Sequence, residues 1–201
     1  MEFSAVVRAR RMVRNYDASR SVERAIIDDM LGLAIRAPSA GFSQGWHFLV
    51  LDTDESRELF WSTTTDPDSP TDRWQRGMRS APALILAMSD KQAYLERYAS
   101  PDKGWTDKDE ARWPVPYWDI DTGMASLLIL LSAVDHGLSS CFFGVPPEHQ
   151  NATKSAFGIP PRMSVVGVIS LGYGVPDPKS PSLKRGRRGL DEVVSYQSMT
   201  D

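Results

Sequence analysis

Apolar residues recur at helical spacing in some stretches of the chain and form short continuous runs in others. From Val22 to Ala37 they return every three or four residues, which predicts a helix with Ser21 as its N-cap. Residues 117–136 predict a longer helix that is apolar on every side from Met124 onward, so we expect it to be the buried central helix. Shorter helices are expected at 3–13, from residue 55, at 73–79 and at 147–157.

Four short runs of apolar and β-branched residues predict β-strands. They cover residues 46–51, 83–88, 140–144 and 164–171. Helices before, between and after a few strands indicate an α+β fold. Neither a repeat nor a linker divides the chain, so we expect residues 1–201 to form a single domain.

Two segments are rich in residues that interrupt regular structure. Residues 62–72 are polar and predict a loop. Residues 99–116 hold three prolines, a glycine and two tryptophans, Trp105 and Trp113. Because a long irregular segment with large aromatic residues favours a packed excursion, we expect a lid-like insertion over a site.

Positive charge is concentrated near the two ends of the chain. One cluster contains Arg8, Arg10, Arg11 and Arg14, and the other contains Lys184, Arg185, Arg187 and Arg188. These eight residues leave 15 bases against 26 acids elsewhere, which disfavours nucleic acid as a partner. Arginine forks suit the oxygens of one compact anion such as a phosphate, although a charge cluster by itself is also typical of a solvated surface.

Other classes of protein and site are disfavoured by what the sequence lacks. No signal-peptide pattern begins the chain and the run 124–134 is too short to cross a bilayer, so we expect a cytoplasmic protein without a membrane partner. The single Cys141 forms no internal disulfide. His47, His136 and His149 show no metal-ligand spacing, so no bound metal is expected.

The sequence motifs give little support to a glycine-rich nucleotide-binding loop or to the nucleophile elbow of a hydrolase. Neither the P-loop nor the Rossmann glycine pattern is present, so side chains must hold any phosphate. Residues 41–45 match G-x-S-x-G, with Ser43 as the serine. A nucleophile elbow needs a strand before the serine and a helix after it, and here the predicted order is reversed. The alternative is a glycine-rich loop whose backbone approaches another group closely.

Five blocks of sequence, taken in order, resemble the nitroreductase family of FMN oxidoreductases. The blocks are residues 10–16, 37–48, 137–144, 171–174 and 184–194. The resemblance implies a central, mostly antiparallel sheet flanked by helices. It also implies a homodimer with two FMN sites at the interface and a C-terminal tail that extends onto the partner subunit.

The resemblance also assigns residues to the cofactor. Those implied to hold FMN are Arg10, Arg11, Met12, Arg14, Pro38, Ser39, Ala40, Phe42, Phe143, Gly144, Arg185 and Arg187. Of these, Arg10, Arg185 and Arg187 match the phosphate ligands, and Arg14 matches a basic residue near the pyrimidine edge of the ring. The segment 38–40 resembles a loop that reaches the flavin of the neighbouring subunit.

Three positions depart from the family pattern. Met12 replaces a usual serine, Phe42 stands where asparagine is common, and Gly45 replaces a proline. Phe42 also belongs to the expected acceptor pocket, whose lining is Phe42, Trp105, Trp113 and Phe142. Met12 removes one hydroxyl donor to the phosphate without removing the site, whereas Phe42 and the segment 99–116 bear on which acceptor the pocket takes and on the identity of the flavin.

The implied activity is transfer of a hydride from NAD(P)H through flavin N5 to a small flat acceptor, a nitroaromatic or quinone, in a ping-pong cycle. No catalytic side chain is expected, because the flavin carries the chemistry. Two alternatives keep the fold: an enzyme that uses a deazaflavin (F420) or performs specialised reductive chemistry, and a non-catalytic flavin-binding protein.

Overall fold

A four-stranded antiparallel sheet forms the centre of the protein in a computed structural model that describes residues 1–66, 71–176 and 180–199. The spatial order is β1-β2-β4-β3. The strands are β1 (Trp46–Leu51), β2 (Ala83–Asp90), β3 (Ser139–Phe143) and β4 (Met163–Gly172). The central pair, β2 and β4, is almost entirely buried, as expected for strands covered on both faces.

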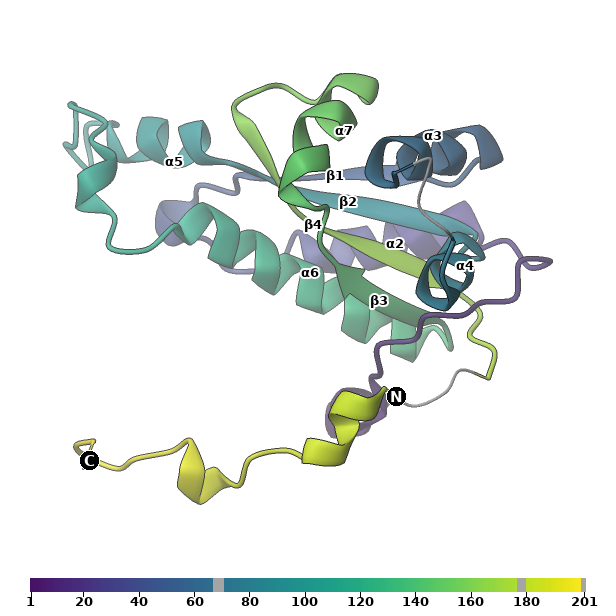
Figure 1. Cartoon of the computed structure of the whole chain (residues 1–201). Coiled ribbons are helices and arrows are strands. Elements are labelled where there is room, and N and C mark those ends of the chain that lie inside the picture. Colours follow the sequence, from purple (N-terminus) through teal and green to yellow (C-terminus); the bar gives the residue numbers. More distant parts are fainter. Residues whose placement is uncertain (67–70, 177–179, 200–201) are drawn as a thin grey trace.

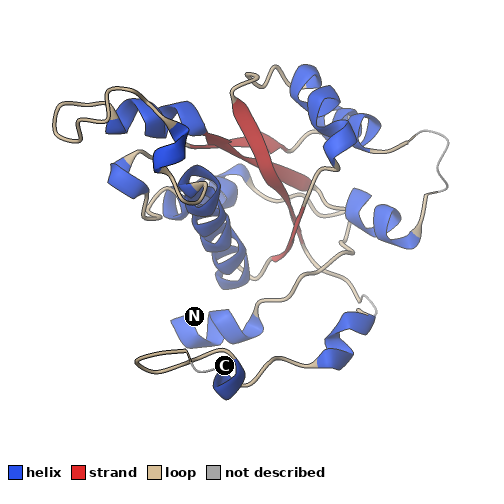
Figure 2. Ribbon diagram, turned by 60° about the vertical axis from the view of Figure 1, so that its left-hand side comes forward, coloured by secondary structure: helices blue, strands red, loops and turns tan. Residues whose placement is uncertain are grey.

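Helices cover both faces of this sheet (Figures 1 and 2). One face packs on α2 (Arg24–Ala34) and α6 (Tyr117–Asp135), and the other packs on α3 (Asp54–Thr64), α4 (Arg73–Arg79) and α7 (Gln150–Ala156). Two further helices, α1 (Phe3–Ala9) and α5 (Lys91–Tyr98), lie beyond opposite ends of α6. This arrangement confirms the predicted α+β fold with an antiparallel sheet.

Short 3-10 turns complete the described secondary structure. They are η1 (Ala40–Phe42), η2 (Glu110–Arg112), η3 (Pro147–His149), η4 (Pro181–Arg185) and η5 (Leu190–Glu192). Residues 67–70 of the predicted 62–72 loop lie outside the described residues, and α3 continues to Thr64 at the start of that range.

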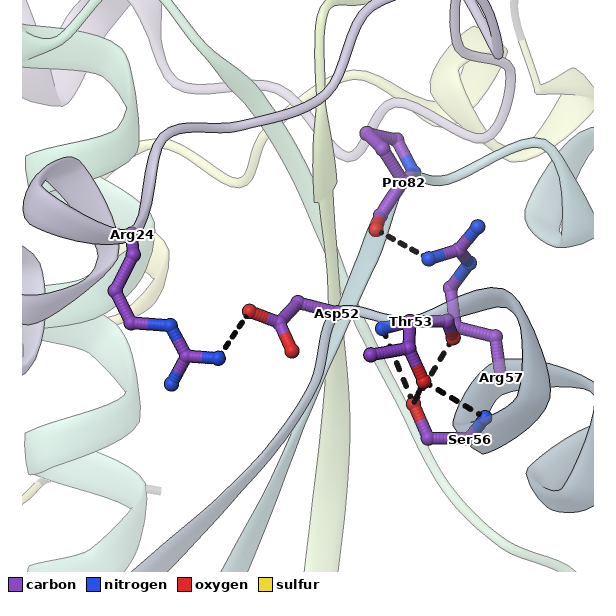
Figure 3. Close-up of polar contacts among 6 residues, drawn as sticks. All are labelled: Arg24, Asp52, Thr53, Ser56, Arg57 and Pro82. Atoms are coloured by element: carbon purple, nitrogen blue, oxygen red, sulfur yellow. Dashed lines mark hydrogen bonds and ion pairs between the residues drawn. The ribbon is translucent and has the colours of Figure 1, made fainter.

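Local polar contacts fix where α3 begins and how it meets the sheet (Figure 3). Thr53 and Ser56 form a reciprocal capping box, which satisfies backbone donors at the start of the helix. Arg57 donates to the carbonyl of Pro82 at 2.8 Å, just before β2. Arg24 pairs with Asp52 at 2.6 Å, so the start of α2 is tied to the end of β1.

The expectation that α6 is buried on every side is wrong within the described chain. Its inner face packs on the sheet through Ile129 and Ala133, both fully buried. Its outer face carries an exposed apolar stripe made of Tyr117, Ile120, Met124 and Leu127, the last 47% exposed. By length and composition α6 could cross a membrane, but this test is also met by core helices that pack on a sheet.

One predicted helix start needs correction, and one helix was not predicted. The first long helix begins at Arg24 with Glu23 as its N-cap, and Ser21 makes no cap. Helix α5 is absent from the predicted elements. It begins after Asp90, whose carboxylate accepts a hydrogen bond from Gln92 N at 3.0 Å. Gly137 follows the end of α6 with a positive φ of 69°.

The C-terminal tail, residues 180–199, lies away from the sheet in both views (Figures 1 and 2). Its described hydrogen bonds all remain within the tail. Several large apolar side chains in it are exposed, among them Leu183, Leu190 and Tyr196. Such a segment has apolar surface that its own chain does not cover.

Candidate functional site

The N-terminal arginine block lies along the outer edge of β3. Met12 pairs with Ser140 in a parallel bridge, and Val13 N donates to Ser140 O at 3.0 Å. Phe142 N approaches the sulfur of Met12 at 3.5 Å. The structure therefore brings residues 10–14 next to the segment that ends in Phe143 and Gly144, two blocks that are far apart in sequence.

Arg10 carries the first sign of an anion site. It follows α1, and its Nη1 atom is buried without a hydrogen-bond partner in the described structure. Buried guanidinium donors are normally paired, so a missing acceptor at this position favours an external anion. Its neighbour Arg11 is exposed and donates to the carbonyls of Arg8 and Arg10 at 2.6 and 3.0 Å.

Arg14 lines a cavity of about 330 Å³ together with two arginines that the sequence did not single out. These are Arg73 and Arg76, which lie three residues apart on α4. The approach of the two segments depends on Gly77, because a Cβ there would lie 2.0 Å from the carbonyl oxygen of Arg14. In the sequence, the only sign of these two arginines is that they lie three residues apart within a predicted short helix.

No acidic side chain lines this arginine cavity among the described residues. Arg14 donates to Met12 O at 3.2 Å, and Arg76 donates to Thr71 O at 2.5 Å, so both guanidinium groups keep further donors. Three fixed positive charges with spare donors suit an electron-rich polar edge or an anion.

A second group of predicted residues lies on the turn between α2 and β1. Pro38 and Ser39 precede η1, and Phe42 is its last residue, with a φ of 57° and an exposed fraction of 75%. Gln44 also has a positive φ, 51°. Positive φ is uncommon for such side chains and marks a loop that its surroundings hold in place.

Asp121 on α6 anchors this loop from inside the protein. It is 1% exposed, and its Oδ2 accepts from Ala40 N at 2.8 Å and from the hydroxyl of Tyr94 at 2.7 Å. Burial, and then the hydrogen bond to Asp121, raise the pKa of Tyr94 far above its ordinary value. The phenol therefore remains a donor to Asp121 at ordinary pH. Gly45 packs on Tyr94, because a Cβ there would lie 2.5 Å from the ring.

The lid segment, residues 99–116, packs on α5 through its two tryptophans. Trp105 and Trp113 lie 4.8 and 4.6 Å from the ring of Tyr98, measured between centroids, and 5.6 Å from each other. The predicted excursion is therefore packed on the protein, while its role over a site stays a prediction.

Arg97 connects this lid segment to the loop that carries Phe42. Its two terminal nitrogens donate to the two carboxylate oxygens of Asp102, each at 2.7 Å, and its Nε donates to the carbonyl of Gly41 at 2.9 Å. The ring of Tyr98 also limits Gly41, since a Cβ there would lie 2.6 Å from it. The lid segment and the loop are thus held by one side chain.

Phe142 lies apart from the other expected pocket residues. Its ring packs in the core on the α6 side of the sheet and occupies the space above Gly167, where a Cβ would lie 2.2 Å from Phe142 Cζ. Its role as a lining residue stays a prediction.

Ser43 has none of the features of a nucleophile. Its hydroxyl donates to Ala40 O at 2.6 Å, and a helix precedes it while a strand follows. The structure agrees with the interpretation of residues 41–45 as a glycine-rich loop rather than a nucleophile elbow.

The two groups of predicted residues lie at opposite ends of α6. Ala40 is held by Asp121 near the start of the helix, whereas the amino group of Met1 pairs with Asp135 at its end, beside the arginine block. At 1.5 Å per residue these positions are about 20 Å apart along the helix axis. One chain thus keeps the two groups of predicted residues apart.

Arg185 and Arg187 belong to the exposed tail, and no described interaction joins them to Arg10. By contrast, Arg188 donates to Glu192 within the tail. The described residues also contain no group of His, Cys, Asp and Glu able to hold a metal ion.

Comparison with known proteins agrees with these blocks. A sequence model of the nitroreductase family matches residues 7–173. The Bacillus subtilis (strain 168) protein YodC, named as an NAD(P)H nitroreductase, is 40% identical over 210 residues, covering 95% of this chain and 96% of its own. A 4-nitrobenzoate reductase of Nocardioides sp. (strain LMS-CY) is 32% identical over 223 residues, covering 96% of this chain and 89% of its own.

Solved structures share the fold over the whole chain. A nitroreductase family protein of Clostridium difficile 630 superposes with a TM-score of 0.72 at 24% identity, covering 99% of this chain and 100% of its own. A protein of Exiguobacterium sibiricum 255-15 in complex with FMN gives a TM-score of 0.74 at 22% identity, covering 98% of each chain.

Proposed function

The chain belongs to the nitroreductase family, and on that premise we propose that it is an FMN-dependent oxidoreductase that passes a hydride from NAD(P)H to a small flat acceptor. The proposal is supported by two features of the arginine block, the buried, unpartnered Nη1 of Arg10 and the cavity that Arg14 lines together with Arg73 and Arg76. The first suits a phosphate and the second suits the polar edge of a ring.

The positive charges and hydrogen-bond donors of this site are compatible with the phosphate and the polar ring edge of FMN. Arg10 would hold the phosphate, and Arg14, Arg73 and Arg76 would meet the pyrimidine edge, while Phe143 and Gly144 would lie against the ring. Bound FMN supplies a ring that takes up and releases a hydride. The arginines stabilise negative charge at the pyrimidine edge, which favours the reduced state without a protein acid or base.

A homodimer explains why one chain contains two half-sites. We propose that α6 packs on α6 of a second copy through its exposed stripe, with the helices antiparallel about a two-fold axis. The start of α6, with Phe42 and the lid segment, then lies near the end of the partner's α6, where the arginines are. Each complete site contains one half from each chain.

In this dimer the C-terminal tail covers the partner. Its exposed apolar residues gain a surface to pack on, and Arg185 and Arg187 add charge-assisted hydrogen bonds to the same phosphate that Arg10 holds. Several guanidinium groups on one phosphate offset the cost of removing it from water.

The acceptor is proposed to be a nitroaromatic or quinone. The relative from Nocardioides is named for reduction of 4-nitrobenzoate, a flat nitroaromatic molecule. Trp105, Trp113 and Phe42 offer aromatic surfaces on which such a molecule stacks, and the lid segment excludes water from it.

The activity is tested by adding NADH or NADPH anaerobically to the protein as purified with its cofactor. We expect the visible absorption band of oxidised flavin to disappear and to return after addition of a quinone. A yellow protein whose band persists with both nicotinamides has another electron donor, and a colourless protein with no bound flavin contradicts the cofactor assignment.

The phosphate assignment is tested with a matched pair in the tail. Arg187→Ala should release FMN during dialysis, whereas Arg188→Ala should retain it, because Arg188 is already paired with Glu192. Equal retention by both variants would remove Arg187 from the phosphate site.

A further inference from the structure

A second cavity, separate from the arginine cavity, lies between α3, α4 and the end of β3. Its volume is about 160 Å³, and Trp61, Thr65, Trp74, Phe143 and Gly144 are among the residues that line it. Helix α4 divides the two cavities, because Arg73 and Arg76 face one while Trp74 faces the other. Phe143 and Gly144 are also proposed to contact FMN, but the rest of this cavity has no role in the proposed hydride transfer.

Three aromatic rings shape it. Trp61 and Phe143 are stacked with centroids 5.9 Å apart and planes inclined by only 4°. Trp74 meets both of them edge-on, 6.5 Å from Trp61 and 5.7 Å from Phe143. Trp74 is partly exposed, so it forms the outer wall. Flat aromatic walls favour a flat ligand.

Two buried polar atoms belong to residues of this wall and have no partner in the described structure. They are Nε1 of Trp61, a residue that is 3% exposed, and Oγ1 of Thr65. A buried indole N–H is a donor only, and buried polar groups are normally satisfied. An acceptor atom inside the cavity would satisfy both groups.

A wider polar cavity continues outward from the aromatic one. Its volume is about 740 Å³, and it shares Thr64, Thr65 and Gln75 with the inner cavity while adding Glu148 and His149. Hydroxyl, amide and charged groups therefore line the route from solvent. This region accommodates a polar substituent, whereas the inner cavity is closed on its core side by Phe60.

We propose that the inner cavity is a binding site for a single aromatic ring that carries a hydrogen-bond acceptor, such as a carbonyl or nitro oxygen. An apolar cavity of about 150 Å³ is large enough for one benzene ring, so the volume fits one ring and excludes fused ring systems. The acceptor oxygen receives hydrogen bonds from Trp61 and Thr65. Gly144 places this site beside the segment proposed to contact FMN, but binding here requires no electron transfer.

Binding is tested on the oxidised FMN-loaded protein labelled with 5-fluorotryptophan, without NAD(P)H. The six tryptophan ¹⁹F resonances are assigned with single Trp→Phe variants. Acetophenone is the probe, because it has one ring and a carbonyl and its binding is read without turnover. We expect saturable shifts at Trp61 and Trp74. Ethylbenzene, which has the ring and no acceptor, should bind more weakly.

Two variants separate the hydrogen bonds from the ring stack. Trp61→Phe keeps an aromatic ring and removes the N–H, and it should weaken acetophenone binding about fivefold to tenfold, as expected for loss of one hydrogen bond. Thr65→Val keeps the shape and removes the hydroxyl, and it should weaken binding severalfold without touching the ring stack. Trp46→Phe is the control, because Trp46 at the start of β1 lines neither of these two cavities and belongs to no proposed site.

Shifts confined to Trp105 and Trp113 would overturn this proposal and leave the proposed oxidoreductase function intact. Equal affinity of Trp61→Phe, Thr65→Val and the unchanged protein would also overturn it, as would equal affinity for acetophenone and ethylbenzene. If Trp61→Phe does not fold, as judged by its near-ultraviolet circular dichroism, Thr65→Val alone decides the outcome.

Discussion

Phe42 shows how one residue stores strain at a site. Its φ of 57° lies in a region where the Cβ of an L-residue crowds the backbone, at a cost of about 1–2 kcal/mol. The loop keeps this conformation because Asp121 binds Ala40 N and Arg97 binds Gly41 O, the two residues just before Phe42. Phe42 is 75% exposed, so the strained loop presents an aromatic surface to solvent.

The strain can be measured by comparing two substitutions. Phe42→Asn should have a free energy of unfolding about 1 kcal/mol greater than Phe42→Ala, because asparagine tolerates positive φ and alanine does not. Both variants lose the ring, so their difference isolates the backbone effect. Urea denaturation gives this difference. Equal stabilities would show that the backbone at position 42 is relaxed.

Asp121 is the residue on which the loop depends most. Asp121→Ala should lower the free energy of unfolding by about 2–4 kcal/mol, because it leaves both Ala40 N and the Tyr94 hydroxyl buried without an acceptor. Tyr94→Phe removes only one of the two donors and should cost about 1 kcal/mol. Thermal and urea unfolding check both values, and a larger loss for Tyr94→Phe would contradict this ranking.

Residues of the candidate site could be predicted only where sequence blocks carried them. Arg10 and Arg14 were expected from such a block, and the unpartnered Nη1 of Arg10 agrees with an anion site. Arg73 and Arg76 were missed because their proximity to Arg14 arises from tertiary packing at Gly77. No local pattern contains that contact.

At the scale of elements, the sequence predicted the bounds of an element correctly where neighbouring residues determine where that element begins and ends. The strand at 46–51 and the helix at 73–79 have the predicted bounds. Helix α5 was missed because its stability comes from the burial of Tyr94 and Leu95 rather than from a clear apolar period. The outer face of α6 was misjudged because apolar composition alone does not distinguish a face that packs on the sheet from one that is exposed on the surface of the chain.

The lid segment should be released by acid. Hydrogen bonds from Arg97 hold the pKa of Asp102 below its ordinary value of 3.8, and those from Arg112 do the same for Asp107. Because the folded-state pKa values are lowered, these ion pairs contribute fully above pH 3.8 and are lost as the pH falls through the lower values. Tryptophan fluorescence should report the release of Trp105 below pH 3.8.

Asp102→Asn supplies the matching test at neutral pH. It removes the charge that holds Arg97, so trypsin should cleave after Lys103 or Lys108 severalfold faster than in the unchanged protein. Asp28→Asn on α2 is the control and should leave the cleavage rate unaltered. Unchanged cleavage in Asp102→Asn would mean that the tryptophans alone retain the segment.

At the scale of the whole molecule, the separation of the two groups of predicted site residues and the exposed apolar surface both agree with the proposed dimer. The stripe on α6 and the apolar tail are surfaces that a single chain leaves in water. Apolar surface of this kind is removed from water when copies associate. We therefore expect the dimer and cofactor binding to be lost together.

Leu127→Glu tests this coupling. A charge in the middle of the stripe should yield a monomer that retains little FMN, as measured by native mass spectrometry. Leu59→Glu introduces the same charge at a similarly exposed position on α3 and should leave a yellow dimer. A Leu127→Glu monomer that keeps its full complement of FMN would show that one chain is sufficient for the site.

In the proposed dimer, the placement of the two half-sites at opposite ends of α6 has a genetic consequence. A cell that carries one gene copy damaged at Arg10 and another damaged at Phe42 would assemble mixed dimers. In such a hybrid both lesions fall in the same pocket, and the other pocket is free of either lesion. Two alleles that are inactive alone would then complement each other, with up to half of the normal turnover per hybrid.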